Sequence, residues 1–201
     1  MVLHPGKKAI RALGVAESFR PNARKSSLAG VVMRSDLVVD GFVFGAATVG
    51  GDDATSSLLR MYRNLKRNDV NLIILSGCII SRYNIVDVDE LAKRSGLPVV
   101  CLTYKESSGI EEAIRRHFQH PEGRIQSYRR LGGRTPVLLH TGQRVYVRCA
   151  GITEPDAKSV LDAFTLQGGL PEPVRVASLL ARAAPRTSPT PRARGGRGET
   201  R

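Results

Sequence analysis

A short aliphatic run, Leu72-Ile73-Ile74-Leu75, ends at Ser76-Gly77 and limits the folds that this chain can adopt. A run of this length, bounded by polar residues, is typical of a strand that is buried on both faces of a sheet. In open α/β sheets, ligands and catalytic groups lie outside the carboxyl ends of such strands. Ser76 therefore marks the position where an enzyme of this class would place a functional side chain.

The segments around this run predict a mixed α/β sheet. Extended segments are predicted at residues 9–15, 28–34, 37–45, 72–75, 97–104 and 144–150. Helical spacing of apolar residues is found at residues 52–65, 86–94, 109–118, 154–164 and 173–184. Hairpin-linked strands followed by strand–helix–strand units predict three antiparallel strands and then parallel ones, with helices on both faces. This order of elements is typical of ribonuclease H-like folds.

We expect one domain over residues 1–184 and a disordered basic tail over residues 185–201, which are rich in Pro, Arg and Gly. No run approaches the roughly 18 apolar residues of a membrane span, and the N-terminus lacks an apolar export segment. The sequence therefore predicts a cytoplasmic protein without a membrane partner and leaves the oligomeric state open. Cys78, Cys101 and Cys149 are predicted to be small buried side chains in a reducing compartment.

The charge balance favours a polyanionic partner. The chain has 31 Lys and Arg against 18 Asp and Glu, a net charge of +13. We expect nucleic acid, with DNA favoured over RNA, although a solvated basic surface is the simpler alternative. Arg82 and Tyr83 follow Ser76-Gly77, and Arg129 and Arg130 lie in a predicted loop at residues 124–134. Arginine binds phosphate and tyrosine stacks on unpaired bases, so these four are the candidate nucleic-acid-binding residues.

Several short segments, in this order and spacing, resemble the archaeal relatives of endonuclease V, a family linked to a deoxyuridine-directed endonuclease. The segments are Arg11-Ala12-Leu13-Gly14-Val15, residues 48–55, Leu75-Ser76-Gly77, residues 83–88, residues 96–100 and residues 170–177. The resemblance covers most of residues 10–184. It implies a ribonuclease H-like fold and a nuclease site whose carboxylates hold Mg or Mn. Such ions prefer oxygen ligands, generate the attacking hydroxide and stabilise the leaving oxygen of a phosphodiester.

Three positions where the family has an acid carry Ala16, Gly50 and Ser76 in this chain. Alanine and glycine offer no ligand, and serine is a weak neutral one, so no metal site is assigned and no cofactor is certain. The remaining catalytic candidates are Glu17 and Asp53. A strand would point Glu17 to the opposite face from residue 16, and Asp53 has helix capping as its alternative role.

We therefore expect an endonuclease V-like protein that binds nucleic acid with absent or weak cleavage, as a pseudoenzyme would. One alternative is an active metal-dependent endonuclease that acts on deaminated bases in DNA repair through a rearranged site with Glu17 and Asp53. A further alternative is a non-catalytic subunit of an archaeal complex. Cleavage assays and recovery of protein partners distinguish the three.

Overall fold

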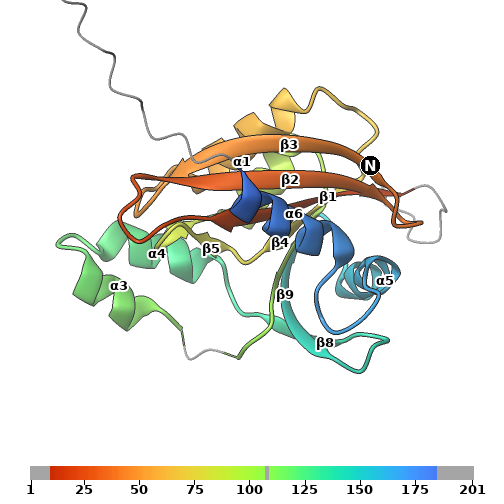
Figure 1. The fold of residues 1–201 in the computed structure, drawn as a ribbon. Coiled ribbons are helices and arrows are strands. Elements are labelled where there is room, and N and C mark those ends of the chain that lie inside the picture. Colours follow the sequence, from red (N-terminus) through yellow and green to blue (C-terminus); the bar gives the residue numbers. More distant parts are fainter. Residues whose placement is uncertain (1–9, 107–108, 185–201) are drawn as a thin grey trace, which may run out of the picture.

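The computed structural model describes residues 10–106 and 109–184, which form one seven-stranded sheet with helices on both faces (Figure 1). The strands of this sheet are β1 Arg11–Ser18, β2 Lys25–Arg34, β3 Val39–Thr48, β4 Leu72–Ser76, β7 Val99–Thr103, β8 Thr135–Leu138 and β9 Arg144–Ala150. A small separate hairpin consists of β5 Ile79–Ile80 and β6 Asn84–Ile85. The strand order in the main sheet is β3-β2-β1-β4-β7-β9-β8.

The strand directions confirm the predicted mixed sheet. β1, β2 and β3 are antiparallel, and β4 runs parallel to both β1 and β7. The last two strands, β9 and β8, are again antiparallel. Central β4 is buried on both faces, because Ile73 and Leu75 pack in one core cluster and Leu72 and Ile74 in the other. The aliphatic run therefore has the position that its composition predicts.

The described residues form six helices, α1 Ala54–Asn64, α2 Val88–Ser95, α3 Glu111–His117, α4 Glu122–Arg130, α5 Glu154–Phe164 and α6 Glu172–Ala183. Four of the six helices cover the two faces of the sheet in pairs, and α3 and α4 pack together beside β6. Leu59 of α1 and Leu91 of α2 belong to the core on one face, and Phe164 of α5 and Val174 of α6 to the core on the other. None of the helices in the described part of the chain is long and apolar enough to cross a membrane.

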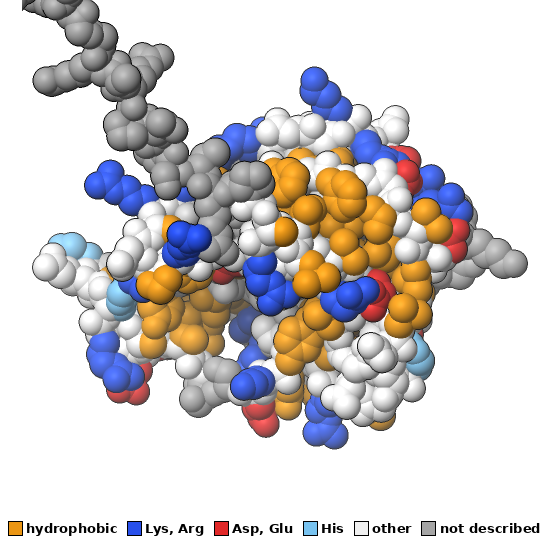
Figure 2. Space-filling view, in the orientation of Figure 1, with side chains coloured by type: hydrophobic (Ala, Val, Ile, Leu, Met, Phe, Trp, Pro, Cys, Tyr) orange, Lys and Arg blue, Asp and Glu red, His pale blue; other side chains and the backbone are white. Residues whose placement is uncertain are grey.

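Helix α6 packs closely on β1 and β2 and leaves β3 at its side. A Cβ atom at Gly14 would come within 2.4 Å of the Pro173 carbonyl carbon, so only glycine permits this approach. Figure 2 shows hydrophobic side chains exposed on this face beside α6. Among them are Phe42 and Phe44 of β3, which are 54% and 50% exposed.

Two expectations about the middle of the chain are wrong. Residues 122–130 form α4 rather than part of a loop, because buried Ile125 anchors the segment to a small core with Ile85 and Ile114. The extended segment β8, which pairs with β9 at the sheet edge, was not expected. It is only four residues long and contains Pro136, which weakens a strand signal. The predicted tail, residues 185–201, lies outside the described residues.

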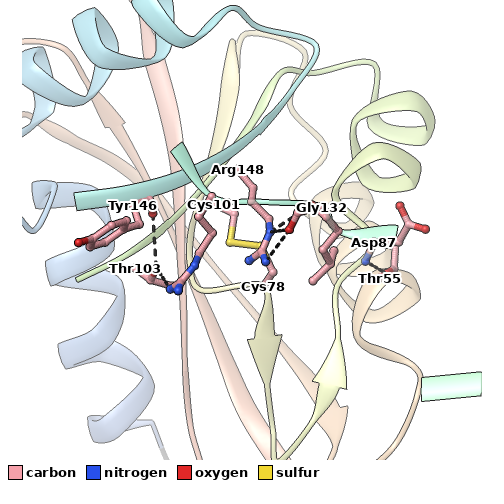
Figure 3. The surroundings of a disulfide bond; sticks show 10 residues. Thr55, Cys78, Asp87, Cys101, Thr103, Gly132, Tyr146 and Arg148 are labelled. Atoms are coloured by element: carbon pink, nitrogen blue, oxygen red, sulfur yellow. Dashed lines mark hydrogen bonds between the residues drawn. A yellow bond between two sulfur atoms is a disulfide. The ribbon is translucent and has the colours of Figure 1, made fainter. Parts of the chain in front are cut away.

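Cys78 and Cys101 are buried as expected but are paired rather than reduced, and Cys149 is only partly buried. Cys78, which follows β4, forms a disulfide with Cys101 of β7 (Figure 3). The bond closes a loop with a sequence separation of 23 and ties the connection after β4 to the neighbouring strand. Cys149 is free, and burial raises the pKa of its thiol to about 11, with a further contribution from Glu154.

Candidate nucleic-acid interface

The carboxyl ends of β1 and β4 lie side by side. Val15 is the register partner of Leu75, so Ala16 and Ser76 follow on adjacent strands. Ala16 packs against Ala177 of α6, and alternation along β4 places Ser76 on the same face. Ser76 is exposed at the end of β4, and burial raises the pKa of Tyr104, which follows the neighbouring strand β7.

Glu17 points to the other face of the sheet, as its place in the strand predicts. Its carboxylate accepts hydrogen bonds from the Ser81 backbone N–H at 2.7 Å and from the Ser81 hydroxyl at 2.6 Å. The Ser81 hydroxyl also lies 2.5 Å from the Ser26 hydroxyl, and both serines are buried. Glu17 therefore fastens the segment after β4 onto the end of β1.

Asp53 occupies the N-cap position of α1, but its side chain makes no capping hydrogen bond to the helix, contrary to its expected alternative role. Its carboxylate accepts hydrogen bonds from the Thr48 backbone N–H at 2.9 Å, the Thr48 hydroxyl at 2.7 Å and Asn84 Nδ2 at 2.8 Å. The buried Asn84 instead receives the Ala54 N–H at 2.9 Å and so closes the helix start. Partial burial would raise the pKa of Asp53, but the hydrogen bonds and nearby Lys25 lower it to about 2.

The connection between β5 and β6 contains three consecutive residues in the left-handed region. Their φ angles are 46° at Ser81, 57° at Arg82 and 64° at Tyr83. Each such non-glycine residue costs roughly 1–2 kcal/mol, so surrounding contacts must hold the turn. The Ser81 carbonyl accepts from Gly50 N at 2.6 Å, and the Tyr83 carbonyl accepts from Arg124 at 2.6 Å. The turn is thus fixed by elements far from it in the sequence.

Arg124 of α4 organises this corner of the molecule. Its guanidinium donates to the carbonyls of Gly51 at 2.5 Å, Tyr83 at 2.6 Å and Gly50 at 3.1 Å. The same group lies over the Phe118 ring, 4.2 Å from its centroid. One side chain therefore joins α4 to the turn before α1 and to the left-handed turn.

The four predicted nucleic-acid-binding residues lie in two different settings. Arg82 and Tyr83 are in the left-handed turn, where Arg82 is exposed and has neither an ion pair nor a side-chain hydrogen bond to another described residue. Arg129 is bound to Glu111 by two hydrogen bonds of 3.0 and 2.8 Å and ties α4 to α3. Arg130 donates to Ser127 at 3.2 Å on α4. The structure brings the first pair, not the second, to the turn beside the strand ends.

Other basic residues border this site. Figure 2 shows the surface hollowed between the lobe of α3 and α4 and the part beneath α6, with Lys and Arg side chains at its edges. The connection from β1 to β2 supplies exposed Arg24 and Lys25. The Arg24 carbonyl accepts from Val49 N at 3.0 Å, and Lys25 Nζ lies 3.6 Å from Asp53, so both residues adjoin the turn before α1.

The residues of this site do not fit a divalent ion held by carboxylates. Among the described residues, no group of three or more His, Cys, Asp or Glu side chains could hold a metal ion. Glu17 and Asp53 already accept hydrogen bonds from the protein and are held on separate elements. Glu172, at the start of α6, is buried and paired with Arg175.

Sequence reasoning did not identify Ser81, Asn84 and Arg124 as organising residues. Asn84 lies in one of the segments that carry the family resemblance, and this was its only signal. Arg124 looks like any other cation in a basic stretch, because its carbonyl acceptors lie 41 to 74 residues away in the sequence.

Comparison with known proteins places the chain in a family. Residues 8–185 match the model of the endonuclease dU family. A UPF0215 protein from Pyrobaculum calidifontis is 41% identical over 170 residues, which cover 84% of this chain and 93% of that protein. A protein of unknown function from Archaeoglobus fulgidus superposes with a TM-score of 0.74 at 28% identity, covering 87% of this chain and 97% of that chain.

The fold also matches endonuclease V. The enzyme from Ciona intestinalis, solved with a DNA that contains inosine, gives a TM-score of 0.58 at 13% identity and covers 88% of this chain and 86% of that chain. This likeness shows a shared ribonuclease H-like fold, in agreement with the sheet order and helix layers described above. The match over residues 8–185 and the 41% identity to a relative show that this chain belongs to the endonuclease dU family.

Proposed function

We propose that this protein binds DNA along the basic hollow at the strand ends and cleaves it weakly or not at all. One observation supports weak or absent cleavage. Both remaining candidate acids, Glu17 and Asp53, are occupied by hydrogen bonds that hold the local backbone. A metal ion would have to displace those donors and release the left-handed turn.

The positions of the two acids add to this argument. Alternation along β1 points the Glu17 carboxylate away from the side chain of Ala16, where the family resemblance expects an acid, and Ser81 holds it there. Two-metal and one-metal phosphodiester chemistry both need carboxylates that converge on one point. Ala16 and Gly50 cannot supply them, and Ser76 supplies only a neutral hydroxyl.

The net positive charge of the chain and its exposed basic side chains favour DNA binding. The net charge is +13; Arg24 and Lys25 are exposed beside the turn before α1, and Arg82 is exposed in the left-handed turn. The backbone of the turn that carries Arg82 is held by hydrogen bonds to Ser81 and Tyr83, which lowers the backbone entropy lost when Arg82 binds a phosphate. The related endonuclease V was solved with a DNA that contains inosine, which supports DNA and deaminated bases as the first ligands to test.

The test combines binding and cleavage on the same duplexes, which contain deoxyuridine, inosine or no lesion. We expect binding that weakens steeply with salt, because phosphate contacts release counterions. With Mg²⁺ or Mn²⁺ we expect no cleavage above that of the Glu17→Gln/Asp53→Asn variant. These two substitutions keep the size of the side chains and remove the negative charges.

Two results would contradict the proposal. Absence of salt-sensitive binding to any of the duplexes would remove the DNA-binding role. Metal-dependent cleavage that the double variant abolishes would instead establish the active enzyme with a rearranged site. Unfolding curves for the variant are needed beside the assay, because both acids also hold structure.

A further inference from the structure

Within residues 10–106 and 109–184, no strand pairs with the outer edge of β3. β3 is the first strand in the sheet order, so β2 covers one of its sides only. Phe42 and Phe44 are 54% and 50% exposed, while Val43 between them is buried in the core with α1, so alternation places both Phe side chains on the face that α6 covers. Half-exposed aromatic pairs of this kind are typical of binding surfaces rather than of solvated strands.

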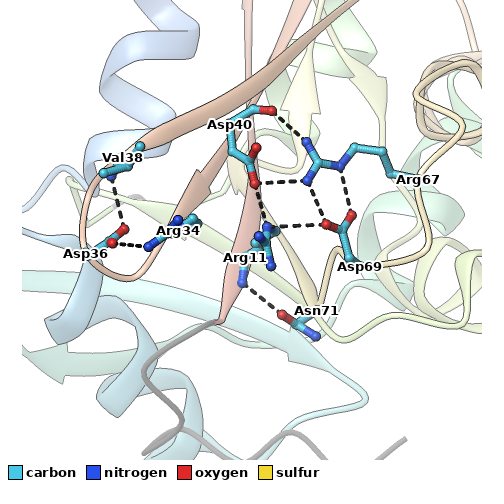
Figure 4. Close-up of polar contacts among 8 residues, drawn as sticks. All are labelled: Arg11, Arg34, Asp36, Val38, Asp40, Arg67, Asp69 and Asn71. Carbon is cyan, nitrogen blue, oxygen red and sulfur yellow. Dashed lines mark hydrogen bonds and ion pairs between the residues drawn. The ribbon is translucent and has the colours of Figure 1, made fainter.

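This edge lacks the features that keep strands from pairing with other chains. Residues 41–49 contain no charged residue and no proline, whereas exposed edges are usually protected by lysine, proline or a bulge. The one bulge lies at the start of β3, where the register with β2 shifts between Val32 and Met33. The nearest acid, Asp40, is already bound by Arg11 and Arg67 (Figure 4). On a chain of net charge +13, the edge is a place where two copies can approach without repulsion.

The sequence of the edge is its own mirror image. Gly41-Phe42-Val43-Phe44-Gly45 reads the same in both directions. Two copies of a strand related by a two-fold axis pair antiparallel, so residue i of one lies opposite a residue of the same segment in the other. We propose that β3 pairs with β3 of a second copy about Val43 and joins the two sheets into one.

This pairing gives the side chains on both faces of β3 suitable neighbours. Phe42 lies opposite the partner's Phe44 on the exposed face, giving two aromatic cross-strand pairs, while the glycines at 41 and 45 face each other. Val43 remains in its own core. At the outer end, Thr48, which accepts from Lys25 Nζ at 2.7 Å, lies opposite the partner's Val38. Lys25 of one copy thereby adjoins the partner's Asp36, which is hydrogen-bonded to Val38 N.

The experiment measures the mass of the full chain in solution over a range of concentrations, by light scattering and sedimentation. We expect a dimer that dissociates on dilution. Phe44→Lys should weaken it by about 30-fold or more, because the substitution removes an aromatic contact twice and places two cations in the interface. Leu179→Lys is the matched control, since Leu179 of α6 is also 50% exposed but is not on β3; it should leave the dimer unchanged.

A cross-link tests the register itself. In the double variant Phe42→Cys/Phe44→Cys, mild oxidation should link the two copies, because position 42 of each lies opposite position 44 of the other. A monomer at every concentration, or a dimer that Phe44→Lys leaves intact, would overturn the proposal. A monomer whose DNA affinity falls with Phe44→Lys but not with Leu179→Lys would also overturn it. The edge of β3 would then contact nucleic acid instead of a second copy.

Discussion

The start and the end of β1 hold carboxylates by different means. At the start, Asp40 accepts from Arg11 at 2.5 Å and Arg67 at 2.9 Å, and Asp69 accepts from Arg67 at 2.7 Å (Figure 4). At the end, Glu17 and Asp53 accept mainly from backbone N–H groups, hydroxyls and an amide, with Lys25 3.6 Å away from Asp53.

The difference explains where positive charge remains available. At the start of β1 each aspartate is ion-paired with arginine, so the charges of the cluster nearly cancel and the cluster stabilises the fold. At the end, neutral groups hold the acids, and Arg82 and Arg24 stay exposed. The acids at both ends therefore hold local structure, and the two ends differ in the cations that remain exposed.

The largest expected effect on stability comes from removing the disulfide. Among the described residues it is found beside the end of β1 and not at its start. Replacing Cys78 and Cys101 by alanine should lower the free energy of unfolding by about 3 kcal/mol, because a closed loop of this length restricts the unfolded chain. Urea denaturation measures it, and a reducing agent should have the same effect on the parent. Cys149→Ala is the control. If reduction leaves the unfolding midpoint in place, the bond does not contribute as described.

The next effect concerns Glu17. Glu17→Ala leaves the N–H and hydroxyl of buried Ser81 without their carboxylate acceptor and should lower the free energy of unfolding by about 2 kcal/mol. Glu17→Gln keeps one acceptor oxygen and should lose roughly half as much. We also expect faster amide exchange in residues 79–85, which Asp40→Asn at the other end should not produce. Equal exchange in both variants would argue against a clamp by Glu17.

Acid unfolding in low and high salt should distinguish the carboxylates at the two ends of β1. The hydrogen bond from Arg67 is the main cause of the low pKa of Asp40, about 2, whereas Asp53 reaches about 2 through Thr48 and Asn84 despite partial burial. A carboxyl whose pKa is lower in the folded state stabilises the fold above its unfolded pKa, near 4. That stability is lost as the pH falls from about 4 to about 2.

The measurement is urea unfolding at pH 5, 3 and 2, in low and high salt. The contribution of Asp53 should be about 1–2 kcal/mol and nearly independent of salt, because its main partners are neutral. The contribution of Asp40 should shrink in salt. Asp53→Asn should reduce the loss of stability between pH 5 and pH 2 by the contribution of Asp53. An unchanged pH profile in this variant would contradict a low pKa for Asp53.

The smallest effect on stability, and a positive one, is expected at Arg82. Arg82→Gly relieves a φ of 57° and should raise the free energy of unfolding by about 1 kcal/mol. The same substitution should weaken DNA binding and reduce the slope of log affinity against log salt by about one. Arg82→Ala should weaken binding equally without the gain in stability. An unchanged salt slope in both would remove Arg82 from the DNA contact.

Much of the architecture could be predicted, because it follows from local patterns. The run 72–75 lies at the centre of the sheet, Gly96 ends α2 with a φ of 72°, and Asp87 caps the start of α2 by accepting from Glu90 N. The opposite facing of Glu17 also followed from strand alternation. The segment 122–130 could not be assigned, since only Ile125 among its residues is buried in the core.

Sequence alone determined the succession of antiparallel and then helix-linked strands, the family resemblance and the residues Ala16, Gly50 and Ser76 at positions where that resemblance expects acids, because these depend on residue identity and short-range periodicity. Only the tertiary structure decided what Glu17, Asp53 and Arg124 do. Glu17 meets Ser81 across 64 positions and Arg124 meets Gly50 across 74. Hydrogen bonds between such distant groups depend on how whole elements pack, and no local pattern encodes them.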